Sequence, residues 1–103
     1  MKNKYTLRYS PLFYKDLEKI ILYIKNELNN IEAANNLLDE IENSLLSRIA
    51  LPTAYEPYIS SKERENVYYR IYVKNYIIFY VVIDDVMEVR RILYSKRDFK
   101  KHL

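Results

Sequence analysis

Three runs of mostly apolar residues follow one another along residues 67–94 with almost no spacer, the first alternating between apolar and polar positions with a period of two and the second apolar on both faces. The runs cover 67–74, 76–83 and 86–94, and each is rich in the β-branched and aromatic residues that favour strands. Asn75 separates the first pair of runs, and Asp84 with Asp85 separates the second pair. Breaks this short permit only hairpins, so the pattern predicts an antiparallel meander of three strands.

The first run predicts a sheet with two unlike faces. One face is apolar, and the other carries aromatic and basic side chains, namely Tyr68, Arg70, Tyr72 and Lys74. Because successive strand residues point to opposite faces, the apolar face packs on a core. In the second run Ile77 and Phe79 add apolar area to the other face. We expect this second face to stay open and to bind a partner, since an apolar patch of that kind marks an interaction site.

Two earlier segments, 11–28 and 31–49, show helical spacing of apolar residues. The first stripe consists of Phe13, Leu17, Ile20, Ile21, Ile24 and Leu28. The second stripe consists of Ala34, Leu38, Ile41, Leu45 and Ile49. Ser10 can cap the first helix, Pro11 suits its first turn, and Asn29-Asn30 can cap the second. Helices joined by so short a link form an antiparallel hairpin.

The remaining segments complete one domain over residues 1–103. Residues 4–9 alternate and predict a first strand, whereas Pro52 and Pro57 make 51–65 a loop. We expect Tyr55 and Tyr58 of this loop to pack under the helices. The order predicts a two-layer α+β fold, β-α-α-β-β-β, with the helix hairpin packed on one face of an antiparallel sheet.

The amino-acid composition excludes several kinds of catalytic and binding site. The chain has no Cys, no Gly and a single His, His102, which leaves no thiolate nucleophile and no glycine-rich phosphate loop. We therefore expect neither a metal nor a cofactor. No apolar run approaches the roughly 20 residues that span a bilayer, and the first ten residues lack a hydrophobic signal region. We expect a cytoplasmic protein without membrane contact.

The net charge of +3 is unevenly distributed. Residues 31–50 hold four acidic residues against Arg48, whereas residues 86–103 hold six basic residues against two acidic ones. A basic end of this kind indicates a partner that carries phosphates or acidic groups. The alternative is ordinary surface charge that keeps the protein soluble.

The order and spacing of three motifs resemble the RelE/ParE superfamily of bacterial type II toxin–antitoxin toxins. The motifs are Tyr69-Arg70-Ile71, Asn75-Tyr76 leading to Phe79-Tyr80, and Arg91-Ile92-Leu93-Tyr94 leading to Lys96-Arg97-Asp98. The resemblance covers nearly the whole chain and implies a toxin that a cognate antitoxin neutralises. It leaves two activities open, because RelE-like members cut messenger RNA in the ribosomal A site and ParE-like members inhibit DNA gyrase.

Our first expectation from this resemblance is a ribosome-dependent, metal-independent mRNA endoribonuclease. The resemblance assigns catalysis to Arg70, Tyr94 and Arg97, and RNA binding to Lys74, Arg91 and Lys96. Arginines would stabilise the charge on phosphorus, and the Tyr94 phenol, where many relatives have His, would transfer a proton. The partners would then be the ribosome and mRNA.

Three departures from the nuclease pattern favour the other activities. Ile77 stands where many nucleases of the superfamily have Arg, and Tyr72 replaces a second basic residue. The C-terminal Tyr of the family has no clear counterpart in the tail Lys101-His102-Leu103. The alternatives are a ParE-like gyrase inhibitor without catalysis and a catalytically weak toxin that acts as co-repressor with its antitoxin. For Arg70, the alternative to a catalytic role is a cross-strand pair with Glu88.

The antitoxin is expected to be a small, acidic, partly disordered protein that orders on binding. We assign its contacts to the aromatic and apolar residues of the open sheet face, Tyr68, Tyr72, Ile77 and Phe79. For the tyrosines, packing against such a partner is the alternative to stacking on RNA bases.

Overall fold

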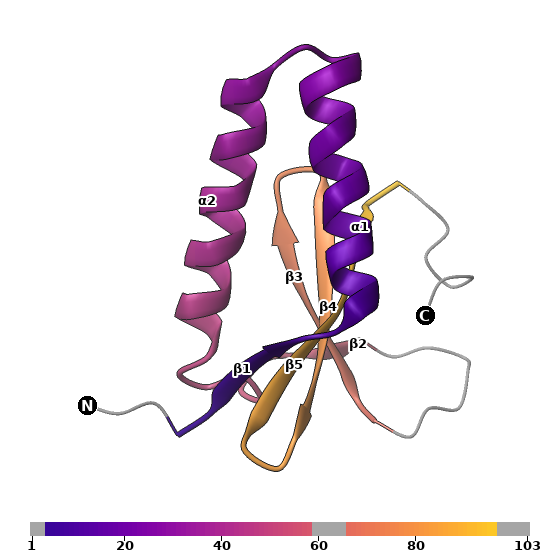
Figure 1. Ribbon diagram of the computed structural model, residues 1–103. Coiled ribbons are helices and arrows are strands. Elements are labelled where there is room, and N and C mark those ends of the chain that lie inside the picture. Colours follow the sequence, from indigo (N-terminus) through magenta and orange to yellow (C-terminus); the bar gives the residue numbers. More distant parts are fainter. Residues whose placement is uncertain (1–3, 59–65, 97–103) are drawn as a thin grey trace.

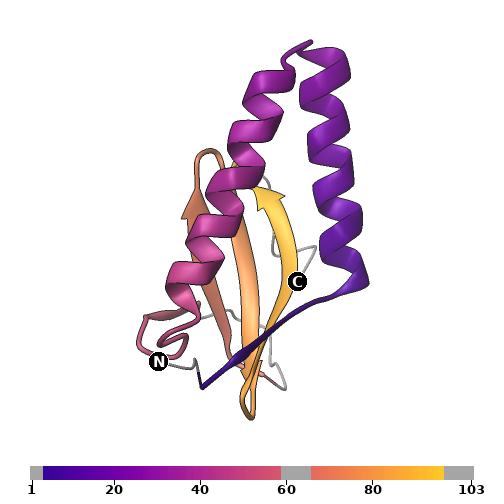
Figure 2. The ribbon, with the colours of Figure 1, turned by 60° about the vertical axis from the view of Figure 1, so that its left-hand side comes forward.

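The computed structural model describes residues 4–58 and 66–96. Helices lie on one face of a five-stranded sheet, which confirms the predicted two-layer α+β fold (Figures 1 and 2). The strands follow the spatial order β1-β5-β4-β3-β2. Their bounds are Thr6–Tyr9 for β1, Pro57–Tyr58 for β2, Tyr68–Val73 for β3, Tyr76–Ile83 for β4 and Val86–Tyr94 for β5.

Both helices begin at the predicted caps. Helix α1 covers Pro11–Leu22, and the Ser10 hydroxyl accepts a hydrogen bond from the Phe13 amide at 3.2 Å. Helix α2 covers Ile31–Arg48, and the Asn30 side chain accepts from the Ala33 amide at 3.0 Å. Each cap satisfies an amide that has no partner within its helix.

The end of the first helix has a wider turn than the sequence predicts. Residues Tyr23–Glu27 (η1) are π-helical, and the Leu28 amide donates to the Tyr23 carbonyl at 3.1 Å. Asn29 then takes a left-handed conformation with φ of 50°, which ends the helix. No helix among the described residues is long and apolar enough to cross a membrane.

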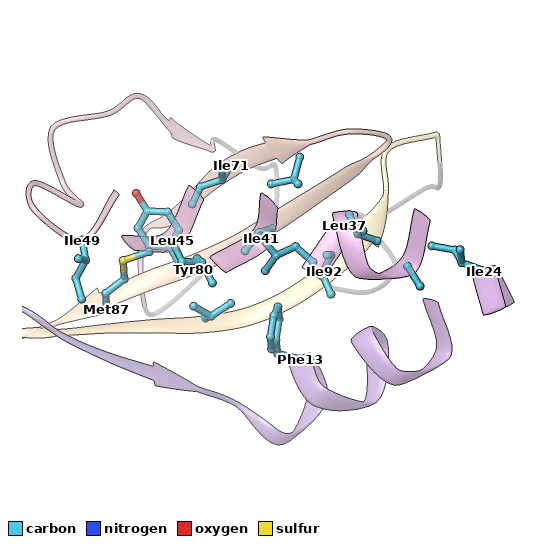
Figure 3. Packing of buried hydrophobic residues seen from close by; sticks show 14 residues of the cluster. Phe13, Ile24, Leu37, Ile41, Leu45, Ile49, Ile71, Tyr80, Met87 and Ile92 are labelled. Atoms are coloured by element: carbon cyan, nitrogen blue, oxygen red, sulfur yellow. The ribbon is translucent and has the colours of Figure 1, made fainter. Parts of the chain in front are cut away.

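The main core lies between the helices and the sheet, where α1 packs on β5 and α2 on β3 (Figure 3). Phe13, Leu45 and Ile92 are among the buried side chains that meet there. Two predicted core positions are wrong. Leu37 is 1% exposed whereas Leu38 is 37% exposed, and Leu28 lies on the surface at the helix tip.

The sheet is mixed rather than purely antiparallel. Strands β3, β4 and β5 form the predicted antiparallel meander, but β1 pairs in parallel with β5, which aligns Arg8 with Glu88. The predicted loop contributes the short strand β2, whose Tyr58 pairs with Tyr68. Tyr58 therefore packs on the face away from the helices, not under them. Local periodicity cannot reveal pairings between strands so far apart in sequence.

A β-bulge interrupts the pairing of β4 with β5. Phe79 lies opposite Arg91, and Tyr80 lies opposite Val89, so Arg90 is an extra residue on β5. A bulge resets the alternation of side chains along its strand. Arg90 and Arg91 therefore do not follow the simple two-face pattern that the sequence predicts.

Candidate functional site

The sheet face away from the helices has a small core of its own. Tyr58, Ile77, Phe79 and Leu93 are buried together there, and Tyr68 packs against them. The expectation that Ile77 and Phe79 lie on an open surface is wrong, because these two residues are 2% and 0% exposed. Their apolar area is already buried within the chain. As candidate antitoxin contacts they offer far less surface than Tyr68, which is half-buried, or their exposed neighbour Tyr72.

Tyr72 and Arg70 share this face, as the alternation predicts. Tyr72 is 64% exposed, and the Arg70 guanidinium lies 5.8 Å from its ring centroid and 5.4 Å from that of Tyr58. Such distances suit cation–π attraction. The expected alternative pairing of Arg70 with Glu88 is wrong, since the Glu88 carboxylate binds Arg8 and Arg90 instead. Within residues 4–58 and 66–96, no carboxylate forms an ion pair with Arg70.

Beside this face, a pocket of about 600 Å³ opens between β1, β5 and the start of α1. The residues that line this pocket, here called the basic pocket, include Arg8, Leu12, Tyr68, Glu88, Arg90 and Arg91. Arg8 Nε donates to Oε2 of Glu88 at 2.8 Å, the Arg8 Nη2 lies 2.8 Å from the same oxygen, and Arg90 donates to Oε1. Burial alone would raise the pKa of Glu88, but the hydrogen bonds from Arg90 and Arg8 lower it overall.

Arg91, a candidate RNA contact, is engaged by a carboxylate of α1. Its Nε lies 2.7 Å from Asp16 Oδ2, and its Nη2 lies 2.8 Å from Oδ1. Oδ2 also accepts from the Ile92 amide at 3.2 Å, on the stretch of β5 beyond its pairing with β1. The hydrogen bond to Asp16 raises the pKa of Arg91. This fork-shaped pair joins the helical layer to the sheet.

Tyr94, a candidate catalytic residue, lies on the helix side of the sheet. It pairs in register with Tyr76, whose ring centroid is 5.9 Å away, and both line a pocket of about 530 Å³ with Lys19 of α1. Arg70 belongs to the opposite face, beside Tyr58. The structure therefore does not bring the predicted catalytic Arg70 and Tyr94 together.

The other basic candidates are dispersed. Lys74 lies in the β3–β4 turn with φ of 52°, and its Nζ is 3.5 Å from Glu40 of α2. The prediction that it shares the face of Arg70 is wrong, because the turn directs its side chain toward the helices. Lys96 is exposed after β5. The candidate catalytic Arg97 lies outside the described residues. In the described part of the chain, no three His, Cys, Asp or Glu side chains gather as a metal site.

Sequence reasoning missed Arg8, Asp16 and Arg90 as parts of this site. Arg8 and Glu88 are 80 residues apart and become neighbours only through the parallel pairing of β1 and β5. In the sequence, nothing distinguishes Asp16 from an ordinary charged residue on the solvent-exposed side of a helix. The one available signal was Glu88 itself, a carboxylate inside an apolar strand run, which implies a cationic partner.

Residues 7–99 match the family described as "ParE toxin of type II toxin-antitoxin system, parDE". The chain therefore belongs to the ParE toxin family of type II toxin–antitoxin systems, within the RelE/ParE superfamily. Comparison with curated protein sequences gives no match.

Solved structures support the same fold. A chromosomal ParDE toxin–antitoxin system from P. aeruginosa aligns with a TM-score of 0.74 and 12% identity, covering 92% of this chain and 100% of that chain. The RelB-RelE antitoxin–toxin complex from Methanococcus jannaschii aligns with a TM-score of 0.51 and 23% identity, covering 93% of this chain and 99% of that chain. At these identities the likeness concerns the fold alone.

Proposed function

We propose that this toxin acts in the cytoplasm by binding DNA gyrase, without cleaving RNA. The observation that carries the proposal is the separation of Arg70 and Tyr94 on opposite faces of the sheet. A proton-transfer group and a charge-stabilising group must reach the same phosphate to act together. Two residues on opposite faces do not meet that requirement.

The state of two further positions supports a binding function. Arg91 is held by Asp16 through two short hydrogen bonds, which lowers its capacity to take a phosphate. Ile77, where many nucleases of the superfamily have Arg, is buried in the second core. A phosphate contact from a charged side chain is worth about 1.5–3 kcal/mol, and this chain lacks it at that position.

The exposed features of the same face suit a protein partner. Arginine and tyrosine are the residue types that dominate binding energy at protein interfaces. Here Tyr72 is exposed beside Arg70, and the basic pocket lies at the margin of this face. As a type II toxin the chain also has a cognate antitoxin as partner, which we expect to be acidic and to cover part of this surface.

Ribosome-dependent mRNA cleavage remains the second candidate, and one observation favours it. The Arg70 guanidinium lies beside two tyrosine rings and has no ion-pair partner in the part of the chain that the structure describes. Such an arrangement could hold a phosphate while a base stacks on Tyr72.

The two candidates are separated by assaying each target directly. Purified toxin is added to gyrase with relaxed plasmid, and in parallel to a reconstituted translation system whose messages are mapped for cleavage. We expect gyrase supercoiling to fall with toxin concentration while messages stay intact. Messages cut within codons at unchanged supercoiling would replace the proposal with the nuclease. Loss of neither activity would leave the co-repressor role and contradict both.

A further inference from the structure

In the described part of the chain, the arginines that line the basic pocket outnumber by one the carboxylates that pair with them. Three arginines, Arg8, Arg90 and Arg91, line it, and two carboxylates pair with them. Asp16 takes Arg91 alone, so Glu88 is shared between Arg8 and Arg90. Among residues 4–58 and 66–96, these arginines therefore carry one positive charge more than their carboxylate partners.

The excess charge is accessible at Arg8. Its side chain is 55% exposed, whereas that of Glu88 is 16% exposed. Arg8 Nε donates to Oε2 of Glu88, and Nη2 lies 2.8 Å from the same oxygen. A guanidinium has five N–H donors in a planar fork, so donors remain for a second oxyanion without loss of the Glu88 contact.

The pocket also has an apolar wall. Leu12 is more than half exposed, and Pro11 and Tyr68 line the pocket with it. Pockets that combine apolar walls with a few convergent polar groups select ligands of matching composition. The complementary ligand has one negative charge attached to an apolar group.

The charge balance of the basic pocket distinguishes between an acidic peptide and a nucleic acid as its ligand. A nucleic acid is bound by rows of cations that each neutralise a phosphate and release counterions. In the basic pocket each arginine already has a carboxylate partner, and the excess is a single charge. This composition matches one carboxylate and does not match a run of phosphates.

We propose that the basic pocket binds a single carboxylate borne on an apolar group, supplied by an acidic segment of DNA gyrase. The assignment of this carboxylate to gyrase rests on the proposed function. The negative charge of Glu88, which pairs with the Arg8 guanidinium, repels an incoming carboxylate. The incoming carboxylate takes the spare donors of Arg8, and its apolar group packs on Leu12.

The proposal predicts opposite effects on ligand binding from two substitutions, each of which replaces a charged side chain with an uncharged one. N-acetyl-leucine serves as the probe, with N-acetyl-leucinamide as its uncharged control, and binding is followed by NMR shifts of the Arg8 Nε–H and the Leu12 methyl groups. We expect Arg8→Gln to weaken probe binding by about fivefold to tenfold. Glu88→Gln removes the carboxylate charge that repels the probe and should tighten binding by about the same factor. If both substitutions weaken binding, or the amide binds as well as the acid, the proposal is overturned. In Arg8→Gln the Leu12 methyl groups alone report binding, because the Arg8 Nε–H is absent from that variant. For both variants, a folded spectrum is required before binding is compared.

Gyrase inhibition tests the source of the carboxylate separately. Lys15→Gln is the matched control, because it removes one positive charge from an exposed position of α1. We expect Arg8→Gln to raise the concentration needed for half-inhibition about fivefold or more, and Lys15→Gln to leave it unchanged. Probe binding to a toxin that does not inhibit gyrase would refute the proposed function and the gyrase assignment, but not the carboxylate pocket. Inhibition unaffected by Arg8→Gln would refute the gyrase assignment alone.

Discussion

Single buried side chains determine how the layers of this protein meet. The Tyr80 ring is fully buried, yet its hydroxyl donates to the Pro52 carbonyl at 2.6 Å and accepts from Arg48 Nη1 at 2.8 Å. Burial raises the pKa of Tyr80, and the hydrogen bond from Arg48 opposes that rise. Arg48 also stacks 3.5 Å from the Tyr55 ring. One satisfied phenol therefore connects the end of α2 and the following segment to the middle of the sheet.

Glu88 gives the clearest pH dependence at this scale. Its pKa is lowered in the folded state below the ordinary 4.5, because hydrogen bonds from Arg90 and Arg8 outweigh the effect of burial. A lowered carboxyl pKa stabilises the fold above the unfolded value, and this contribution disappears as the pH falls through the folded value. We expect Glu88→Gln to lower the free energy of unfolding by about 1 kcal/mol at neutral pH.

Urea unfolding of both proteins across the acid range tests this expectation. The difference between wild type and Glu88→Gln should begin to shrink near pH 4.5 and continue to shrink at lower pH. A difference that stays constant through the acid range would attribute the effect to packing rather than to the charge.

At the scale of elements, the sequence predicts the features that depend on residues close together in the chain, such as strand bounds and helix caps. Strands β4 and β5 have the predicted bounds, and the caps at Ser10 and Asn30 form as predicted. The helical stripe of α2 was misassigned by one residue because Leu37 and Leu38 are adjacent and both apolar. The π-helical turn and the parallel partner of β1 depend on contacts that no local pattern encodes.

The turns of the meander show the cost of a chain without glycine. Lys74 and Asp84 adopt φ of 52° and 55° in their hairpins. This left-handed region is unfavourable for most residues with a Cβ and is tolerated better by Asn. We expect Lys74→Asn to raise the free energy of unfolding by about 0.5–1 kcal/mol, because the exposed ion pair that it removes contributes little.

Thermal unfolding of Lys74→Asn beside Lys96→Asn measures this effect. The second variant removes the same charge from an exposed position with no positive φ. An equal change in both variants, or a loss of stability in the first, would show that the turn conformation is not strained.

At the scale of the whole molecule, the sheet separates two surfaces. The alternation in β3 correctly predicts that Arg70 and Tyr72 share the face away from the helices. It could not predict that Tyr58, arriving from a distant segment, helps bury Ile77 and Phe79 in a second core. Nor could it predict that the basic pocket forms where the first and last strands meet.

This separation gives the two candidate activities different responses to one pair of substitutions. Tyr94→Phe removes only a hydroxyl, on the side of the sheet that faces Lys19, whereas Arg70→Ala removes the cation beside Tyr58 and Tyr72 on the other side. A gyrase-binding toxin should lose about tenfold or more in inhibition with Arg70→Ala, as expected for an interface arginine, and almost nothing with Tyr94→Phe. A nuclease that uses the phenol for proton transfer should lose about 100-fold or more of its RNA cleavage rate with Tyr94→Phe.

Growth after induced expression, measured together with gyrase supercoiling by each purified variant, distinguishes the two activities. Equal loss of toxicity in both variants would contradict the separation of the faces as the basis of function, provided that both variants unfold at the wild-type temperature.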